Sequence, residues 1–356
     1  MVTFSIHGAD TDIQGKNTMR CIVKGGVRMM ASSFAALFLA SCAVLPAGKT
    51  SAGEGQTKKM DNTMTEKKLL TNADPFILYH NNVYYSYGTN HADGVLVYES
   101  QDLHSWKLVE NGRESFALKK EDIWGDKWFW APEVYFLKDR FLIYLTSDYH
   151  ISCAESSAPT GPFVQKVKQP MSAGERRIDN HLFIDDDGKG YCFFSRCLDT
   201  FGGSAIWAVE VESDYMTVKE DTLFRCLGRT EPWEMVQNAI VEGPFVIKHD
   251  GKYYLTYSAN DYKSHDYAVG YAVADNVKGP YVKIEKAPIL HRPANMVGAG
   301  HHSFFTDKEG KLRIVFHVHN SETKIHPRYV VIGDVFFENG RMRIGKEFIV
   351  PTVQSE

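Results

Sequence analysis

Five ionisable side chains stand at matching points of a motif that recurs along the chain: Asp74, Glu133, Asp179, Glu242 and His301. Carboxylates gathered in one place support two kinds of chemistry. Their oxygens are suitable ligands for Ca2+. Alternatively, one ionised and one protonated carboxyl group can cleave a glycosidic bond by acid–base catalysis. Repulsion between neighbouring carboxylates separates their pKa values, so a third acid can keep the general acid protonated near neutral pH.

The motif that positions these residues is a hairpin that occurs five times. Its copies open at residues 74, 133, 179, 242 and 301, which are 59, 46, 63 and 59 residues apart. In each copy a polar residue precedes a short apolar strand, a turn containing Asn, Asp or Gly, and an aromatic-rich strand, and each interval holds a second hairpin. Four strands per unit, five units and no helical period predict an all-β fold, a five-bladed β-propeller. A β-sandwich, the alternative, would not explain a fivefold period.

The opening residues are expected to meet in space. The first strand of each propeller blade lines the central channel, so its opening residue lies at one end of that channel. For any single acid, capping a strand or bonding to a turn would be an adequate explanation. Four acids and a histidine in one place indicate a functional site, because like charges brought together are costly.

The composition limits the class of protein. The chain has 356 residues, 44% of them hydrophobic and 24% charged, with a formal net charge of −4. These values exclude a disordered, collagen-like or disulfide-scaffold protein. The near-neutral charge argues against a nucleic-acid partner. The aromatic share of 13% favours β-structure and a sugar- or base-stacking surface. The four cysteines of the repeat region match no zinc pattern and are expected to be buried thiols: Cys153, Cys192, Cys197 and Cys226.

The N-terminal region has the order of an export signal. Lys24 and Arg28 precede an apolar stretch over residues 29–40 that is too short to span a bilayer. The stretch ends in Leu39-Ala40-Ser41-Cys42, which resembles a bacterial lipobox with Cys42 as the lipidated first residue of the mature protein. A plain signal peptide with an unrelated cysteine is the alternative.

Three segments follow from this pattern. We expect residues 1–41 to be a signal peptide or lipoprotein leader, 42–66 a flexible tether, and 67–356 the propeller domain. The protein would then be an exported lipoprotein of the bacterial cell envelope, in the periplasm or on the outer-membrane surface. Its contact with the membrane would be through the lipid anchor alone. A closed propeller has few exposed strand edges, so a monomer is expected.

Several short motifs together resemble glycoside hydrolase family 43, the inverting arabinofuranosidases, xylosidases and arabinanases. The resemblance covers roughly residues 70–350, and its specificity comes from the order and blade-by-blade placement of motifs that are weak individually. These motifs are Ala73-Asp74-Pro75-Phe76-Ile77, Trp130-Ala131-Pro132-Glu133-Val134, Ile178-Asp179, Glu242-Gly243-Pro244 and Gly300-His301-His302-Ser303.

The resemblance implies a role for each matching acid. Asp74 would be the general base that activates water, Glu242 the general acid, and Asp179 the residue that orients Glu242 and tunes its pKa. His301 matches a histidine that in the family lies in the channel near a calcium ion held largely by water. No cofactor would be required, and a structural Ca2+ in the central channel would be optional.

Other residues are weaker candidates. Trp130 is expected to stack on the sugar, although a core tryptophan is an equally good interpretation. Arg328 could reach the substrate from blade five, or could be an exposed structural arginine. His317 and His319 share a strand face but have no third metal ligand, so packing is favoured. The segment Asp185-Asp186-Asp187-Gly188 lacks the spacing of a calcium loop and is expected to be a hairpin turn.

The predicted function is an inverting glycosidase that acts on plant cell-wall polysaccharides, with an oligo- or polysaccharide as its partner. The first choice is an α-L-arabinofuranosidase; a β-xylosidase or an endo-arabinanase would use the same three acids. A retaining fructan hydrolase is disfavoured because its opening motif is absent around Asp74. A non-catalytic glycan-binding propeller is also disfavoured, since none of the three acids is lost.

Overall fold

The computed structural model describes residues 68–197 and 203–354. The predicted leader and tether, including Cys42, lie outside these residues. Across the two described ranges, no helix is long and apolar enough to cross a membrane.

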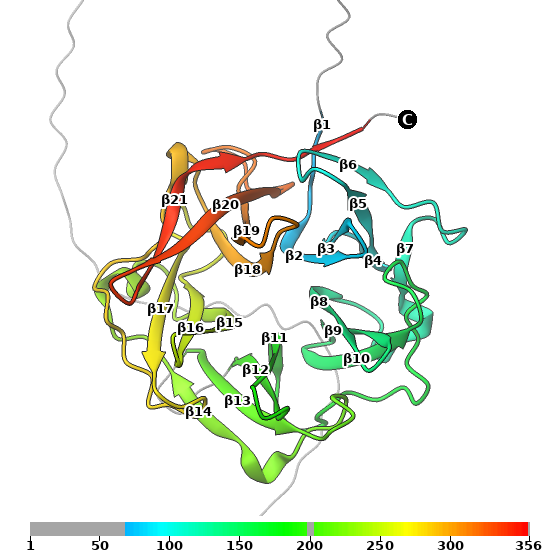
Figure 1. Cartoon of the computed structure of the whole chain (residues 1–356), viewed down its shortest axis with the longest axis horizontal. Helices are drawn as coiled ribbons and strands as arrows, with labels where there is room; N and C mark the ends of the chain where they lie inside the picture. The colour runs from blue at the N-terminus through cyan, green and yellow to red at the C-terminus, as the bar shows by residue number, and fades with distance from the viewer. Residues whose placement is uncertain (1–67, 198–202, 355–356) are drawn as a thin grey trace, which may run out of the picture. The chain divides into compact units, whose positions relative to one another are not determined.

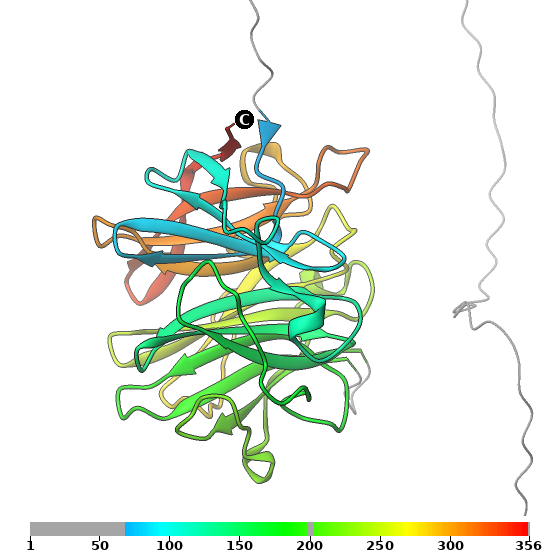
Figure 2. The ribbon, with the colours of Figure 1, turned by 90° about the vertical axis from the view of Figure 1, so that its right-hand side faces the viewer.

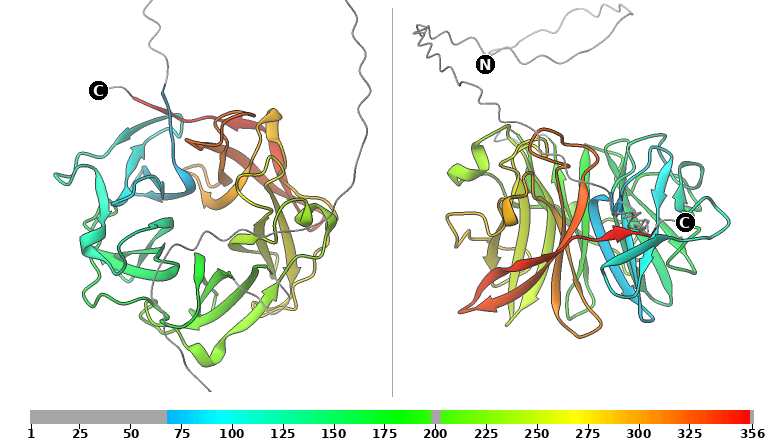
Figure 3. Two further views of the ribbon diagram at one scale, coloured as in Figure 1. Left: turned by 180° about the vertical axis from the view of Figure 1, so that it is seen from behind. Right: turned by 90° about the horizontal axis from the view of Figure 1, so that it is seen from above.

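Five of the β-sheets in the described residues are arranged around a central axis, which confirms the predicted five-bladed β-propeller (Figure 1). The same ring of sheets is visible from behind (Figure 3). The first strand of each blade is innermost, and these strands are β2 (Ala73–His80), β8 (Trp130–Leu137), β11 (Arg177–Ile184), β15 (Val241–His249) and β18 (Gly300–Thr306).

The remaining strands extend each blade outward by antiparallel pairing. They are β3 (Val83–Thr89), β5 (Tyr98–Ser100) and β6 (Ser105–Leu108) in blade one; β9 (Arg140–Ser147) and β10 (His150–Ser156) in blade two; β12 (Gly190–Arg196), β13 (Ala205–Val211) and β14 (Phe224–Leu227) in blade three; β16 (Lys252–Ala259) and β17 (Ala268–Ala274) in blade four; and β19 (Leu312–Val318), β20 (Tyr329–Glu338) and β21 (Arg341–Ile349) in blade five.

Short elements occupy the connections. A two-stranded sheet joins β4 (Gly94–Leu96) to β7 (Phe116–Lys119). The 3₁₀ helices of the described part of the chain are η1 (Lys120–Asp122), η2 (Glu220–Thr222), η3 (Pro232–Met235) and η4 (Pro293–Asn295).

The second strand of a blade is covered on both faces by neighbouring sheets. In β9 every residue after Arg140 is buried, and in β16 every residue after Lys252 is buried. This position explains the continuous apolar and aromatic sequence of these strands, which does not alternate as a half-exposed strand would.

Blades two and four are three-stranded, so the prediction of four strands per blade is wrong for them. The expected outer strands are reduced to single bridges between Glu155 and Val164 and between Val273 and Val282. Each of these segments begins with a Gly-Pro turn, at Pro162 and at Pro280. Proline has no N–H to donate to a strand ladder, which accounts for the interrupted pairing.

Both ends of the described chain belong to the sheet of blade one. β1 (Lys68–Leu69) pairs antiparallel with β22 (Thr352–Val353), and β22 pairs in parallel with β6. Figure 2 shows β1 and the C-terminal segment at the same end of the molecule. This pairing fastens the last blade to the first and closes the ring.

Two further sequence predictions are decided by the fold. Cys153 and Cys192 are buried thiols as expected, whereas Cys197 and Cys226 are half-buried; all four are free. The segment 185–188 is the predicted hairpin turn between β11 and β12, and the N–H of Gly188 donates to the carbonyl of Asp185 at 2.9 Å.

Candidate active site

A β-bulge near the start of the first strand of every blade creates the site. The pairing register shifts there in all five blades. At each bulge one residue has a left-handed φ: Asp74 (50°), Ala131 (46°), Asp179 (57°), Gly243 (56°) and His301 (44°). A bulge re-aims a side chain, and a left-handed residue other than glycine stores about 1–3 kcal/mol of strain. Three of the five predicted site residues therefore occupy strained positions.

The bulges also show that the acids aligned in the sequence repeat are not all at equivalent positions. Glu242 precedes the left-handed residue of its blade by one position, and Glu133 follows that of its blade by two. Glu133 lines the channel, but its Oε2 contacts the hydroxyl of Tyr135 and lies 3.1 Å from Nδ1 of His181. Its carboxylate is thus engaged away from the other acids, and the predicted convergence of four equivalent acids is only partly correct.

Asp74 is a buried carboxylate that lies beside an arginine, two histidines and a threonine hydroxyl. Its Oδ1 lies 3.0 Å from Nη1 of Arg328, 3.3 Å from Nδ1 of His317 and 3.4 Å from Nδ1 of His301. Its Oδ2 accepts a hydrogen bond from the hydroxyl of Thr89 at 2.6 Å. Burial alone would raise the pKa of Asp74, but Arg328 and the histidines outweigh burial and hold the pKa well below its ordinary value. Asp74 is therefore ionised, which is the state that a general base requires.

Glu242 and Asp179 have the opposite tendency. Burial raises the pKa of Glu242 to about 7, with a smaller contribution from the negative charge of Asp74. Burial and repulsion from Glu242 raise the pKa of Asp179 well above its ordinary value. The pair therefore retains a proton near neutral pH, which is the requirement for a general acid.

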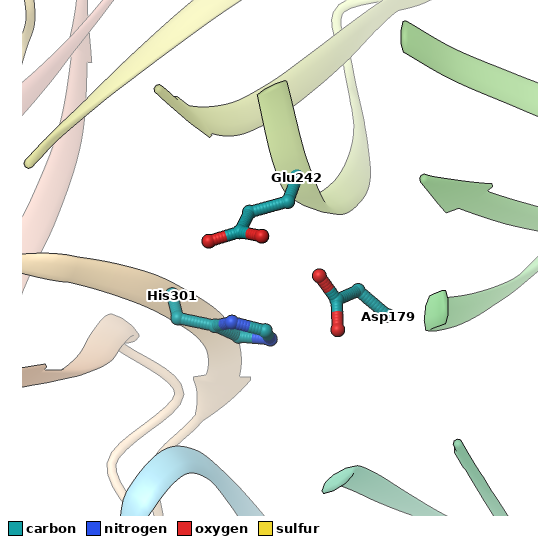
Figure 4. Close-up of side chains that lie close together, drawn as sticks. All are labelled: Asp179, Glu242 and His301. Carbon is teal, nitrogen blue, oxygen red and sulfur yellow. The ribbon is translucent and has the colours of Figure 1, made fainter. Parts of the chain in front are cut away.

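The geometry brings Asp179, Glu242 and His301 together. Their ligand-type atoms all lie within 4.8 Å of one another, and the three side chains point toward a common centre (Figure 4). The backbone N–H of Asp179 donates to the hydroxyl of Thr146 at 3.0 Å. Oδ2 of Asp179 is buried without a hydrogen-bond partner among the described residues, so this oxygen is available to a proton or a substrate hydroxyl.

A second group of polar atoms lines a small pocket in the channel. It includes His301, Glu133 and the amide of Asn180, whose two polar atoms are buried and have no partner in the described chain. Carboxylate and amide oxygens are ligands that Ca2+ prefers. These residues fit the predicted calcium ion, which stays a prediction.

The two predicted substrate contacts have different surroundings. Trp130 is half-buried, stacks on Trp128 with ring centroids 5.6 Å apart, and meets the ring of Tyr149 at 5.6 Å. Arg328 has only 9% of its side chain exposed, and its guanidinium lies between Asp74 and the ring of Tyr262. The exposed structural arginine is therefore excluded.

The sequence analysis did not find Thr89 and Tyr267, and it interpreted His317 as a packing residue. The hydroxyl of Tyr267 donates to Oε1 of Glu242 at 2.8 Å. His317 is packed as predicted, against Tyr267, but it also accepts the backbone N–H of Asp74 at 3.1 Å. Strand pairing could have identified two of them, because Thr89 pairs with Ala73 and His317 with Gly300, each beside a bulge. His319 has a structural contact, with Nε2 at 2.8 Å from the carbonyl of Tyr262.

Comparison with known proteins places the chain in one family of glycosidases. The model of glycosyl hydrolases family 43 matches residues 69–342. A solved structure titled endo-1,4-β-xylanase from Bacteroides thetaiotaomicron is 40% identical, with a TM-score of 0.76, and the match covers 82% of this chain and 99% of that one.

Two curated relatives match more distantly. A β-D-galactofuranosidase of Aspergillus niger is 30% identical over 186 residues, which is 50% of each chain. An extracellular exo-α-(1→5)-L-arabinofuranosidase of Streptomyces avermitilis is 24% identical over 83% of this chain and 63% of its own length. The chain thus spans between half and two thirds of these relatives.

Proposed function

Because the chain belongs to glycosyl hydrolase family 43, whose members hydrolyse O-glycosyl bonds with inversion, we propose that it removes α-L-arabinofuranosyl residues from plant cell-wall polysaccharides. The observation that carries the catalytic assignment is the opposed pKa shifts of its buried acids. Asp74 is held ionised, whereas Glu242 and Asp179 retain a proton. An inverting glycosidase needs one acid in each state.

The proposed reaction is a single displacement. Asp74 takes a proton from water as the water oxygen attacks the anomeric carbon. Glu242 gives its proton to the glycosidic oxygen as the bond between that oxygen and the anomeric carbon breaks. Asp179, the second buried acid beside Glu242, orients Glu242 and tunes its pKa. Inverting enzymes keep the two catalytic carboxyl groups about 6.5–9.5 Å apart, which leaves room for the water.

The surroundings of the acids support roles for two further side chains. Arg328 keeps Asp74 ionised and has donors left to bind a sugar hydroxyl. Trp130 offers an aromatic face at the start of β8, next to Ala131, whose N–H donates to Thr89. We assign sugar stacking to Trp130, since an apolar sugar face packs well on an aromatic ring.

Arabinose is the first choice for the sugar because the arabinofuranosidase relative aligns with 83% of this chain. Xylose is the second candidate, favoured by the 40% identity to the structure titled endo-1,4-β-xylanase. The word "extracellular" in the name of the arabinofuranosidase relative supports export of this chain as well. The lipid anchor at Cys42, the monomeric state and the optional calcium ion stay predictions.

The test is hydrolysis of 4-nitrophenyl α-L-arabinofuranoside and 4-nitrophenyl β-D-xyloside, with Glu242→Gln as the control. We expect release of 4-nitrophenol from the arabinofuranoside that disappears in the variant. Faster release from the xyloside would replace arabinose by xylose. If neither these glycosides nor polymeric arabinan and arabinogalactan gave turnover dependent on Glu242, the glycan-binding alternative would be adopted.

A further inference from the structure

Tyr267 contacts the general acid but has no part in the reaction described above. It directly precedes β17 in blade four and is fully buried. Its hydroxyl donates to Oε1 of Glu242 at 2.8 Å. Burial, together with the negative charge of Glu242, raises the pKa of Tyr267 well above its ordinary value, so the phenol stays protonated and remains a donor.

The ring of Tyr267 is held so that its hydroxyl cannot turn away. On one side it stacks on His317, with centroids 5.8 Å apart and an angle of 17° between the planes. On another side it lies against Gly300, where an added Cβ would come within 2.4 Å of the ring carbons. Gly300 immediately precedes the bulge residue His301, so the absence of a side chain there is what admits the ring.

These contacts distinguish the two oxygens of Glu242. Oε1 accepts the hydrogen of the Tyr267 hydroxyl, which has no other hydrogen-bond acceptor among the described residues, so a proton on Oε1 would leave the phenol hydrogen unpaired. The proton therefore resides on Oε2. We propose that Tyr267 is a positioning residue that fixes Oε2 as the oxygen of Glu242 that gives its proton to the leaving group.

The hydrogen bond also acts during the reaction. As the proton moves from Oε2 to the glycosidic oxygen, the carbon–oxygen bond breaks with its electrons passing to that oxygen, and Glu242 becomes a carboxylate. The Tyr267 hydroxyl then stabilises the new charge on Oε1 and stays protonated throughout. Charge-assisted hydrogen bonds of this kind are about twice as strong as neutral ones. This inference rests on the proposed role of Glu242 as general acid.

The test compares Tyr267→Phe with a matched control, Tyr257→Phe. Tyr257 is also buried in blade four, and its hydroxyl donates to the buried carboxylate of Glu234 at 2.5 Å, away from the catalytic acids. Both variants therefore lose one phenol–carboxylate hydrogen bond. The substrates are two aryl glycosides of the preferred sugar, one with an unactivated phenyl group and one with 2,4-dinitrophenyl, which leaves without protonation.

In Tyr267→Phe we expect kcat/KM for the phenyl glycoside to fall about 10- to 100-fold, and that for the dinitrophenyl glycoside by less than about 3-fold. The basic limb of the kcat/KM profile should move up by about 1 pH unit, because the ionised form of Glu242 loses a donor. Tyr257→Phe should change neither the ratio of the two substrates nor the limb.

A second variant keeps the hydroxyl and should move the basic limb of the kcat/KM profile in the opposite direction. Incorporation of 3,5-difluorotyrosine at position 267 makes the phenol a stronger donor, so the basic limb should move down. Equal losses on both glycosides with unmoved limbs in both variants would overturn the proposal and leave Tyr267 a packing residue. Failure of the proposed function gives a different result, since the wild type would then show no turnover, or turnover that Glu242→Gln retains.

Discussion

Replacement of Arg328 by methionine tests how the general base is kept ionised. In the structure, Nη1 of Arg328 lies 3.0 Å from Oδ1 of Asp74, and both side chains are more than nine-tenths buried. Methionine has a similar length and no charge. Burial then opposes ionisation of Asp74 with the histidines and the Thr89 hydroxyl left to counter it, so the pKa of Asp74 should rise.

The size of the effect follows from the geometry. Unit charges 3.0 Å apart attract by about 5.5 kcal/mol at an effective dielectric constant of about 20, which corresponds to about 4 pKa units. Water that enters the vacated space would recover part of this loss, and measured carboxylate–arginine pairs shift a pKa by about 1–3 units. We therefore expect the acidic limb of the kcat/KM profile to move up by about 1–3 pH units.

The assay is the pH dependence of kcat/KM for wild type, Arg328→Met and Arg328→Lys. The lysine variant keeps the charge and should leave the limb close to its wild-type position. Arg313→Met is the matched control, because it removes the cation paired with buried Asp307 (Nε to Oδ2, 2.8 Å) and should not move the limb. A uniform loss of rate in Arg328→Met with an unmoved acidic limb would refute the reasoning and leave substrate binding as the role of Arg328.

Three further predictions concern stability. Glu242→Gln should raise the free energy of unfolding by up to about 3 kcal/mol at pH 8 and by little at pH 4. Because the pKa of Glu242 is about 7 in the folded protein and lower in the unfolded chain, ionisation of Glu242 destabilises the wild-type fold as pH rises. Equal urea midpoints for wild type and variant at pH 8 would contradict this. Asn260→Ala should cost about 2–4 kcal/mol in the same assay, since the buried amide binds four backbone groups of segments 233–237 and 266; a loss below 1 kcal/mol would contradict this. Deletion of residues 350–356 should lower the free energy of unfolding by about 3 kcal/mol, because the backbone hydrogen bonds between β22 and blade one are lost. An unchanged thermal midpoint would show that ring closure does not need β22.

The repeat made the fold predictable. Its period placed the first strand of each blade, and the polar residue at each opening located Asp74, Asp179, Glu242 and His301 near one end of the channel. This worked because strand period and turn chemistry are local properties of the sequence. The same local reasoning failed for the outer strands of blades two and four, where a proline interrupts the ladder.

The details of the site depend on contacts between distant segments. The bulge shifts the register by a residue or two, so Glu133 and Glu242 occupy different positions relative to the left-handed residue, although they look equivalent in the repeat. Tyr267 and His317 come from blades four and five and meet only when these two blades pack side by side. Tyr267 gave no signal as a single tyrosine, and His317 was noticed only as one of two histidines on a strand face and interpreted as packing.

The division of work between Asp74 and Glu242 is the central claim, and leaving-group dependence tests it most directly. We would measure kcat/KM of Asp74→Asn and Glu242→Gln on the phenyl and 2,4-dinitrophenyl glycosides of the preferred sugar. Glu242→Gln should lose about 10²- to 10⁴-fold on the phenyl glycoside and far less on the dinitrophenyl glycoside, which needs no general acid. Asp74→Asn should lose a comparable factor on both, because water must be activated in either case. The reverse pattern would contradict the assignment of base and acid. A loss in Glu242→Gln that is as large on the dinitrophenyl glycoside as on the phenyl glycoside would contradict it as well.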